Sequence, residues 1–317
     1  MKKEAIAAKL RWLIAGIVLI CVVFAAWMAV LAGLTNRAQR IPVLIYHNIS
    51  AENITDRSRN LTSGASFAAE MEFLHNNGYQ VIPLKKLISH MQYGEKLPEK
   101  ALVITFDDGY EGDYKVAYPI LKKYNMPATI FLIANRDQYF GPDAPPMLTW
   151  EEMREMEGSG LIDIQAHTYS LHCPVYTGKE RTSLKPATVA GAYRPELGRR
   201  ETKKEFADKL YEDFLLARTT IEANLQKQVD TMAWPFGAYN CTSLRMARKA
   251  GFKYFATTRR GMNEYADSVQ VIRRISEDDN ISLDQFAKFI EPDYSYFRQL
   301  RQVTFRYLNR LTELFVL

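Results

Sequence analysis

Carboxylate and imidazole side chains follow several short apolar runs of the sequence, at the points where those runs end. Asp107 and Asp108 come directly after Leu-Val-Ile-Thr-Phe, and His47 follows Val-Leu-Ile-Tyr. His167 follows Ile-Asp-Ile-Gln-Ala, and His172 lies five residues further on. In a β/α barrel the catalytic groups come from the carboxyl ends of the strands. These five residues are therefore predicted to share one site.

Two histidines and a carboxylate are a common metal-binding set. His167 and His172 with one of the two acids would leave coordination positions open, which suits zinc in hydrolysis and iron(II) in oxygen chemistry. The adjacent acids favour hydrolysis, because one can bind the metal while the other stays free as a base. Gly109 follows the pair and allows the chain to turn, so that both carboxylates can reach one site.

Each of these motifs also has an ordinary structural interpretation. Asp107-Asp108-Gly109 alone is typical of a turn or a helix N-cap, and His167 alone is typical of a hydrogen-bonded core histidine. Their joint occurrence at separate strand ends favours the metal site. His75 and His90 lie in predicted helices, and we interpret them as ordinary helix residues.

The elements that must position these residues follow from alternating apolar and amphipathic stretches. Strands that are mostly Val, Ile and Leu, each followed by a helix, indicate a parallel sheet covered on its outer face. Seven or eight such units predict a closed or distorted (β/α)7-8 barrel. Strands are expected at Val43–Tyr46, Tyr79–Ile82, Ala101–Phe106, Ala128–Ile133, Leu161–Gln165, Thr231–Trp234, Tyr254–Ala256 and Val269–Ile272. Helices are expected at 67–76, 84–91, 113–124, 151–157, 203–226, 241–249 and 283–290. Ser66 is a candidate N-cap, and Thr149 with Glu152 forms a candidate capping box.

Two segments depart from this rhythm. Residues 173–200 are rich in Gly and Pro and are predicted to be a surface insertion in a domain that spans 41–290. Residues 291–317 are dense in aromatic and Arg side chains and are predicted to form a basic aromatic helix. Such a helix could lie on anionic lipid or pack on the barrel with its Arg face in solvent.

The first 40 residues are predicted to be a short cytoplasmic stub and a membrane anchor. From Trp12 to Leu34 the chain has no charge, and at about 1.5 Å per residue this length spans a bilayer core of about 30 Å. The run is long for a cleaved signal peptide, although cleavage stays the alternative. Four basic residues precede the span and two follow it, which predicts a single-pass protein of the bacterial cell membrane with its larger part outside the cytoplasm.

The net charge of +5 belongs to this leading segment. Residues 1–40 hold six basic and one acidic side chain, so the rest of the chain holds 35 of each. A nucleic-acid-binding protein would carry its basic excess on the folded part, so we expect no nucleic acid partner. Outside the anchor, Cys173 and Cys241 could pair in an oxidising space or stay unpaired, and the sequence leaves both open.

The motifs resemble those of the polysaccharide deacetylases, also called carbohydrate esterase family 4, over most of residues 41–290. Thr105-Phe106-Asp107-Asp108-Gly109-Tyr110 is similar to the first family motif, and His167 to His172 to the second. Trp234-Pro235-Phe236-Gly237 is similar to the third. The resemblance implies Asp107 as general base and a metal held by Asp108, His167 and His172. It further implies that the Phe236 N–H stabilises the oxyanion, with substrate contacts from Tyr110, Trp234 and Pro235.

Two departures from the family pattern point to a subgroup. Ala233 stands where most members have an arginine that orients the base, and no histidine follows His172 to act as general acid. The deacetylases of biofilm poly-N-acetylglucosamine share these losses, and they take the acid from a Tyr-His dipeptide on the first strand. Tyr46-His47 is similar to that dipeptide, which implies His47 as the acid. Arg273 or Arg274 is a candidate replacement for the missing arginine.

The resemblance implies a metal-dependent hydrolase that releases acetate from an extracellular N-acetylglucosamine polymer. One divalent ion is expected, zinc first, with cobalt, nickel or iron compatible with the same ligands. Two other functions remain open: a membrane-tethered glycan-binding protein without catalysis, and a deacetylase of peptidoglycan or chitin oligomers. A glycosidase would leave the histidines unexplained. The sequence identifies no protein partner.

Overall fold

The computed structural model describes residues 12, 16–27, 39–51, 61–135, 145–276 and 282–291. The chain divides into two compact units, residues 1–39 with 293–317 and residues 40–292, and we describe each by itself.

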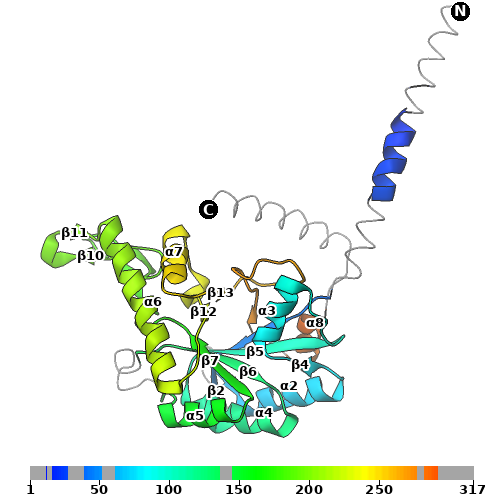
Figure 1. The fold of residues 1–317 in the computed structure, drawn as a ribbon, viewed down its shortest axis with the longest axis horizontal. Coiled ribbons are helices and arrows are strands. Elements are labelled where there is room, and N and C mark those ends of the chain that lie inside the picture. The colour runs from blue at the N-terminus through cyan, green and yellow to red at the C-terminus, as the bar shows by residue number, and fades with distance from the viewer. Residues whose placement is uncertain are drawn as a thin grey trace, which may run out of the picture. The chain divides into compact units, whose positions relative to one another are not determined.

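A parallel sheet of eight strands forms the centre of the larger unit (Figure 1). Its strands are β1 (Val43–Tyr46), β4 (Gln80–Val81), β5 (Ala101–Asp108), β6 (Ala128–Leu132), β7 (Ile162–Ala166), β12 (Thr231–Ala233), β13 (Tyr254–Ala256) and β14 (Ile275–Ser276). The hydrogen-bonded path runs β13-β12-β7-β6-β5-β1-β14, and β4 pairs with β5 outside that path. All of these pairings are parallel, as the continuous apolar strands predicted.

The sheet curves into a half-barrel rather than a regular closed barrel. One isolated bridge, between Ala256 and Ile272, joins the β13 end of the path to the segment that leads into β14. The predicted strand Val269–Ile272 was therefore wrong in its bounds. A turn in which the Val271 N–H donates to the Ser268 carbonyl occupies most of it, and the strand forms later, at Ile275–Ser276.

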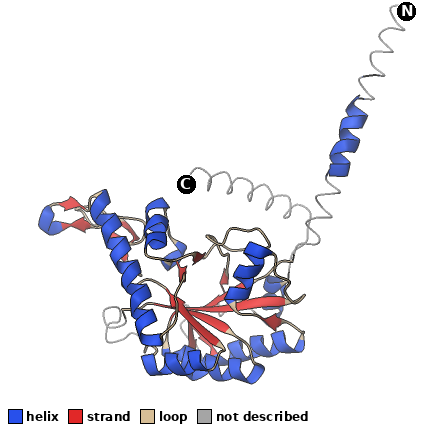
Figure 2. Ribbon diagram, in the orientation of Figure 1, coloured by secondary structure: helices blue, strands red, loops and turns tan. Residues whose placement is uncertain are grey.

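Helices cover the two faces of the sheet unequally (Figure 2). The larger apolar core lies between the outer face and the helices α2 (Gly64–Asn76), α4 (Tyr118–Tyr124), α5 (Trp150–Gly158), α6 (Lys203–Leu225), α7 (Cys241–Lys249) and α8 (Leu283–Ile290). A smaller core on the other face joins α3 (Leu84–Tyr93) to strand residues such as Val43, Val103 and Phe131. In Figure 1, α3 lies across the sheet from α2, α4 and α5.

Local signals fixed several element boundaries. The Thr149–Glu152 capping box is present at the start of α5, as predicted. The N-cap of α2 is Ser63 instead of Ser66, because the Ser63 side chain accepts from the Ser66 N–H. The predicted helix 113–124 is divided into a π-helical turn, η1 (Asp113–Ala117), and α4. Two short strands that pair with each other, β2 (Asn48–Ser50) and β3 (Leu61–Ser63), were not predicted.

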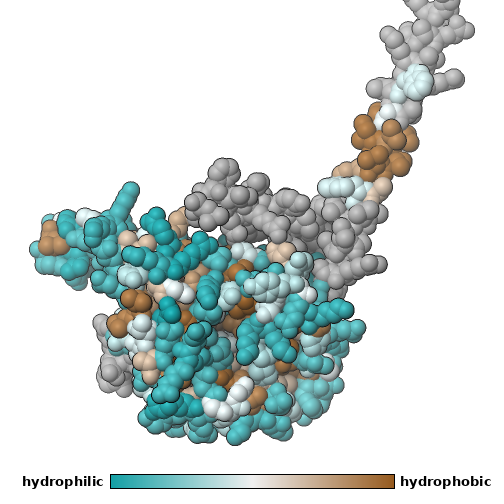
Figure 3. Space-filling view, viewed as in Figure 1, coloured by the Kyte–Doolittle hydropathy of each residue, from teal (hydrophilic) through white to brown (hydrophobic). Residues whose placement is uncertain are grey.

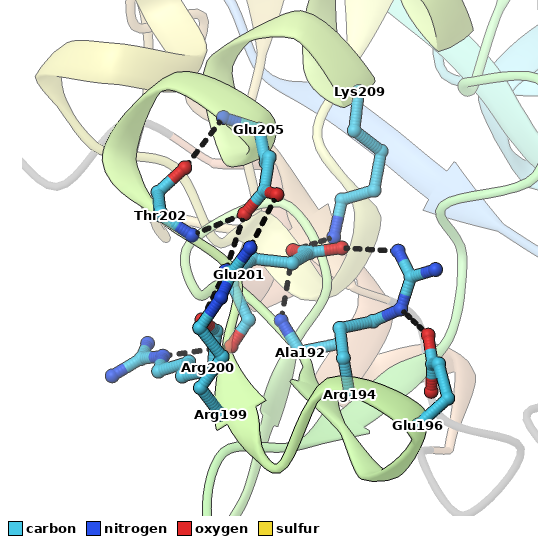
Figure 4. Close-up of polar contacts among 10 residues, drawn as sticks. Ala192, Arg194, Glu196, Arg199, Arg200, Glu201, Thr202, Glu205 and Lys209 are labelled. Carbon is cyan, nitrogen blue, oxygen red and sulfur yellow. Dashed lines mark hydrogen bonds and ion pairs between the residues drawn. The ribbon is translucent and has the colours of Figure 1, made fainter.

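The stretch predicted as a surface insertion folds mainly into two antiparallel hairpins. One pairs β8 (Pro174–Tyr176) with β9 (Leu184–Pro186), and the other pairs β10 (Tyr193–Arg194) with β11 (Arg199–Arg200) around the turn η2 (Pro195–Leu197). Figure 4 shows that the second hairpin is held against the first turns of α6. Glu205, the N3 residue of a capping box with Thr202, also accepts two hydrogen bonds from Arg199. Cys173 and Cys241 are both free thiols.

The smaller unit is described only in part. Residues 16–27 are helical, and their exposed apolar side chains appear brown in Figure 3. Within the described residues, no helix combines the length and apolar character needed to cross a bilayer. The predicted anchor, Trp12 to Leu34, lies partly outside the described residues, and all but the first residue of the predicted C-terminal helix 291–317 lies outside them.

Candidate active site

Asp107 and Asp108 end the fully buried strand β5, between β1 and β6. Neighbouring side chains on a regular strand point to opposite faces. Here the backbone leaves the regular strand conformation at Asp108, which has a φ of 77°, and Gly109 follows with a φ of 87°. A Cβ at Gly109 would lie 2.5 Å from the Leu132 side chain, so this turn also needs the missing side chain. The turn brings both carboxylates into one site, as the sequence predicted.

His167 and His172 lie on the loop that follows β7, and both rings face Asp108. The His167 Nδ1 lies 2.9 Å from the Ala233 carbonyl, which can only accept, so this nitrogen carries the proton and Nε2 is free to bind a metal. Each histidine Nε2 lies 3.5 Å from the Asp108 Oδ1. Ala233 thus contributes a main-chain acceptor at the position where the family pattern has an arginine.

These three residues form a site suited to a divalent cation. Their candidate ligand atoms all lie within 4.8 Å of one another. The Asp108 Oδ1 is buried and has no hydrogen-bond partner among the described residues, as expected of an oxygen reserved for a metal. Burial lowers the pKa of His167 to about 4 despite the opposing charge of Asp107. Its ring is therefore neutral near pH 7, the state in which imidazole binds metals.

Asp213 of α6 holds the loop that carries both histidines. One of its carboxylate oxygens accepts from the Tyr169 N–H at 3.0 Å, and the other accepts from the Ser170 N–H at 2.7 Å. Thr168, in the same loop, has a φ of 71°. Burial raises the pKa of Asp213 to about 6, although the two N–H donors favour its charged form. The sequence analysis did not identify this residue. Its signal was a carboxylate on the buried face of a helix, among Phe206, Leu210, Phe214 and Ala217.

Arg274 makes a two-point contact with Asp107. Its Nη1 donates to Oδ1 at 2.6 Å and its Nη2 donates to Oδ2 at 2.8 Å. The Arg274 side chain is fully buried, and its Nε donates to the Thr257 carbonyl. Burial alone would raise the pKa of Asp107, but the Arg274 charge outweighs it, and the pKa falls to about 2. Arg273 instead contacts Asp267 and the Met262 carbonyl, so the two candidate arginines have different partners.

His47 follows β1 and lies beside Asp107. The parallel register pairs Tyr46 with Phe106, which sets the next residues, His47 and Asp107, at the same level of adjacent strands. The two groups are close enough for the His47 charge to lower the pKa of Asp107. His47 is half-buried, whereas Tyr46 is fully buried and donates from its hydroxyl to Glu70 at 2.8 Å.

The residues of the third motif have different surroundings. The Phe236 ring is 52 % exposed, and its centroid lies 4.6 Å from that of His172. Phe236 has a φ of 56°, an uncommon conformation for a residue with a Cβ. Trp234 is fully buried and stacks between Tyr239 and Phe255, so its ring packs in the core and has no surface to offer a sugar. Pro235 is also buried.

Tyr110 and Asp113 lie just beyond β5. Tyr110 is half-buried and forms an isolated antiparallel bridge with Met147. Asp113 is 2 % exposed, and neither of its carboxylate oxygens has a hydrogen-bond partner among the described residues. Burial first, and then the charge of Asp108, raises the pKa of Asp113 well above its ordinary value. Asp113 was also missed in the sequence, where it looks like an ordinary acid in the first turn of a helix.

This fold and site define a class of protein. A parallel half-barrel whose strand ends carry a His-His-carboxylate set and a second, free carboxylate has the equipment of a metal-dependent hydrolase.

Comparison with known proteins narrows the class. Residues 94–255 match the polysaccharide deacetylase family. The polysaccharide deacetylase homologue YxkH of Bacillus subtilis (strain 168) is 31% identical over 259 residues, covering 81% of this chain and 78% of the relative. The poly-beta-1,6-N-acetyl-D-glucosamine N-deacetylase of Escherichia coli (strain K12) is 27% identical over 282 residues, covering 81% of this chain but 42% of the relative. A solved de-N-acetylase from Aggregatibacter actinomycetemcomitans is 29% identical with a TM-score of 0.70, covering 79% of this chain and 99% of that chain.

The chain belongs to the polysaccharide deacetylase family. It is a hydrolase that acts on carbon–nitrogen bonds, and its Asp108, His167 and His172 are consistent with the divalent metal site of that family.

Proposed function

We propose that this protein removes acetyl groups from a poly-N-acetylglucosamine polymer outside the cytoplasm. The observation that carries the proposal is the position of His47 beside Asp107, at neighbouring strand ends and at the same register. It supplies an acid and a base at one site, although described residues after His172 include no histidine. The similarity to a named poly-beta-1,6-N-acetyl-D-glucosamine N-deacetylase supports the choice of polymer.

The proposed chemistry divides the work among this chain's own residues. A divalent ion, zinc in the first instance, held by Asp108, His167 and His172 would supply Lewis-acid chemistry at the acetamide carbonyl. Asp107 accepts a proton from the attacking water, whose oxygen bonds to the carbonyl carbon. His47 donates a proton to the nitrogen as the carbon–nitrogen bond breaks, so acetate and a free amine leave.

Two further groups are assigned to positioning and charge stabilisation. Arg274 keeps Asp107 charged and fixes the plane of its carboxylate through the two-point contact. The main-chain N–H of Phe236 is proposed to donate to the developing oxyanion, where one such donor contributes about 3–4 kcal/mol. Tyr110, half-buried beyond Asp108, is proposed to contact the substrate. Pro235 is proposed to hold Phe236 in place.

The test is acetate release by the full chain from poly-β-1,6-N-acetylglucosamine, chitin oligomers and peptidoglycan, with bound metal measured on the same sample. The proposal expects release from the first polymer in proportion to bound zinc. The variant Asp107→Asn should bind the metal and release no acetate. Release from peptidoglycan or chitin oligomers alone would refute the proposed substrate, and glycan binding without release at any metal loading would refute catalysis.

We also propose that residues 12–34 anchor the protein in the bacterial cell membrane with the catalytic unit outside. The support is the uncharged apolar stretch and the excess of basic residues before it. The full chain should sediment with membranes, and a variant without residues 1–40 should be released. The catalytic unit should be cut by protease added to spheroplasts, and its protection there would contradict the orientation.

A further inference from the structure

The half-barrel has a seam between β7 and β12. The two strands meet at one residue pair, Met232 with Ala166, and separate towards their amino-terminal ends. The Gln165 side chain fills the role of the missing strand partner, because its Oε1 accepts from the N–H groups of Asp230 and Thr231 at 3.3 Å and 3.0 Å. Since the backbone groups of the seam are satisfied in this way, the strands can stay apart and leave space between them.

A cavity of about 470 Å³ lies at this seam, bordered by α3 on its other side. Its lining includes Gln165, Ser89 and Gln92, which offer hydrogen-bonding groups, and two tyrosines, Tyr93 and Tyr254. Tyr93 is 78% exposed, so its ring is available to a ligand. Cavities that hold small molecules have volumes of about 300–1,000 Å³. This one is large enough for a small organic ligand.

The charges in the lining are largely compensated within the protein. Asp163 accepts from Lys227 and from the Gln165 amide. Asp230 lies 3.9 Å from the Lys253 Nζ. Lys85, also in the lining, is exposed. The cavity therefore offers many hydrogen-bonding groups with little net charge, which suits a neutral ligand rich in hydroxyl or amide groups.

We infer that this seam cavity binds a neutral acetylated sugar unit of the polymer, as a second glycan site remote from the catalytic one. The inference rests on the proposed function. Amide and carboxylate side chains satisfy the paired donors and acceptors of sugar hydroxyls. A tyrosine ring provides an apolar face with a polar tip, which suits a ligand that is itself apolar on one side and polar at its edge. Gln92 and Tyr93 are the residues of α3 assigned to this contact.

The position of the cavity predicts which substrates benefit from it. Asp163 precedes His167 by four residues on β7, so the cavity and the metal site lie roughly 13 Å apart along the strand direction at about 3.3 Å per residue. They are at opposite ends of the half-barrel. A long polymer bound at the cavity raises the effective concentration of its other units at the catalytic site, whereas a short oligosaccharide cannot occupy both.

The first test is kinetic and uses the full chain with Tyr93→Ala and Gln92→Ala. We expect KM for long poly-N-acetylglucosamine to rise about five- to tenfold, with kcat unchanged and kcat/KM for a trimer unchanged, as expected when effective concentration is lost. Tyr176→Ala is the matched control, because Tyr176 is an exposed tyrosine of β8 that does not line the cavity. An unchanged KM for the polymer, or an equal loss on polymer and trimer, would overturn the inference while leaving the proposed function intact.

The second test is direct binding, by soaking crystals of the full chain carrying Asp107→Asn with N-acetylglucosamine trimer. Sugar density against Tyr93 and Gln165 is expected, and an empty cavity at saturating trimer would overturn the inference. Failure of the proposed function has a different signature, because neither trimer nor polymer would then release acetate with the unaltered chain. Sugar in the cavity under that outcome would uphold the second site as a glycan site of a non-catalytic protein.

Discussion

Arg274 and Asp107 form a buried two-point ion pair between the segment entering β14 and the end of β5, with contacts of 2.6 Å and 2.8 Å. Arg274 reaches Asp107 from the last strand of the sheet, and Ala233 of β12 leaves the family's usual arginine position without a side chain of that kind. The same carboxylate is thus held by an arginine that comes from a different strand.

Replacing Arg274 with Met should raise the pKa of Asp107, because the charge that lowers it is removed while burial, which raises it, stays. The acid limb of the pH profile of kcat/KM should therefore move to higher pH. Leaving Asp107 buried and unpaired should also cost about 3–5 kcal/mol of unfolding free energy. Both effects are measurable, by acetate release from pH 4 to 8 and by urea unfolding.

Arg273→Met is the matched control for that experiment. Arg273 is adjacent in sequence but contacts Asp267 and the Met262 carbonyl, so its loss should leave the acid limb where it is. An equal shift in the two variants would mean that the effect comes from general charge loss and not from the two-point contact.

Replacing His47 with Gln should lower kcat about 10²–10⁴-fold, the usual contribution of a general acid. The metal content should stay unchanged, because the candidate ligand set consists of Asp108, His167 and His172. Metal analysis and acetate release on one preparation check both statements. His75→Gln is the control, since His75 packs beside Tyr124 on the outer helices. Loss of metal from the His47 variant would make His47 a ligand and move the acid elsewhere.

Replacing Asp213 with Ala should weaken metal binding, about 10–100-fold by analogy with other residues that orient metal ligands. Asp213 touches no candidate ligand, and it acts through the N–H groups of Tyr169 and Ser170, between the two histidines. The dissociation constant for Co²⁺, measured by chelator competition, and the absorption spectrum of the Co²⁺ form should both change.

Asp208→Ala is the control on the same helix, because Asp208 is exposed and pairs only with Lys204 among the contacts described. Identical Co²⁺ affinity and spectrum in the Asp213 variant and the control would refute the positioning role of Asp213.

Local patterns in the sequence predicted the strand ends of the site well. Asp107, Asp108, His47 and His167 all follow strands that were identified from apolar runs, because a buried parallel strand must be apolar on both faces. The turn that brings the two acids together was also anticipated from Gly109. What a strand end faces is local information, and here it was enough to assemble the metal set.

Contacts between distant segments were not readable in the same way. Arg273 and Arg274 were equal candidates in sequence, and only the path of the turn before β14 determines which one reaches Asp107. Asp213 and Asp113 were missed because a carboxylate in a helix is normally exposed, and their burial depends on which face packs inward. Trp234 was expected near the substrate, but the stacking of Tyr239 and Phe255 encloses it.

The raised pKa of Asp213 predicts a pH-dependent contribution to folding. Its pKa is about 6 in the folded protein against an ordinary 3.8, so the folded state binds the extra proton between these values. The stabilisation from this group is complete below about pH 4 and is lost as the pH rises through 6, a change of about 3 kcal/mol. In the metal-free protein His167 has the opposite effect, because its lowered pKa destabilises the fold as the pH falls from 6.5 towards 4.

Asp213→Asn separates the two effects, because the variant keeps the His167 contribution and loses that of Asp213. The difference in unfolding free energy, wild type minus variant, should increase by about 3 kcal/mol in favour of the wild type as the pH falls from 7 to 4. Urea unfolding of the metal-free chains at several pH values measures it. A difference that does not vary with pH would mean that Asp213 titrates at its ordinary value and that burial does not raise its pKa.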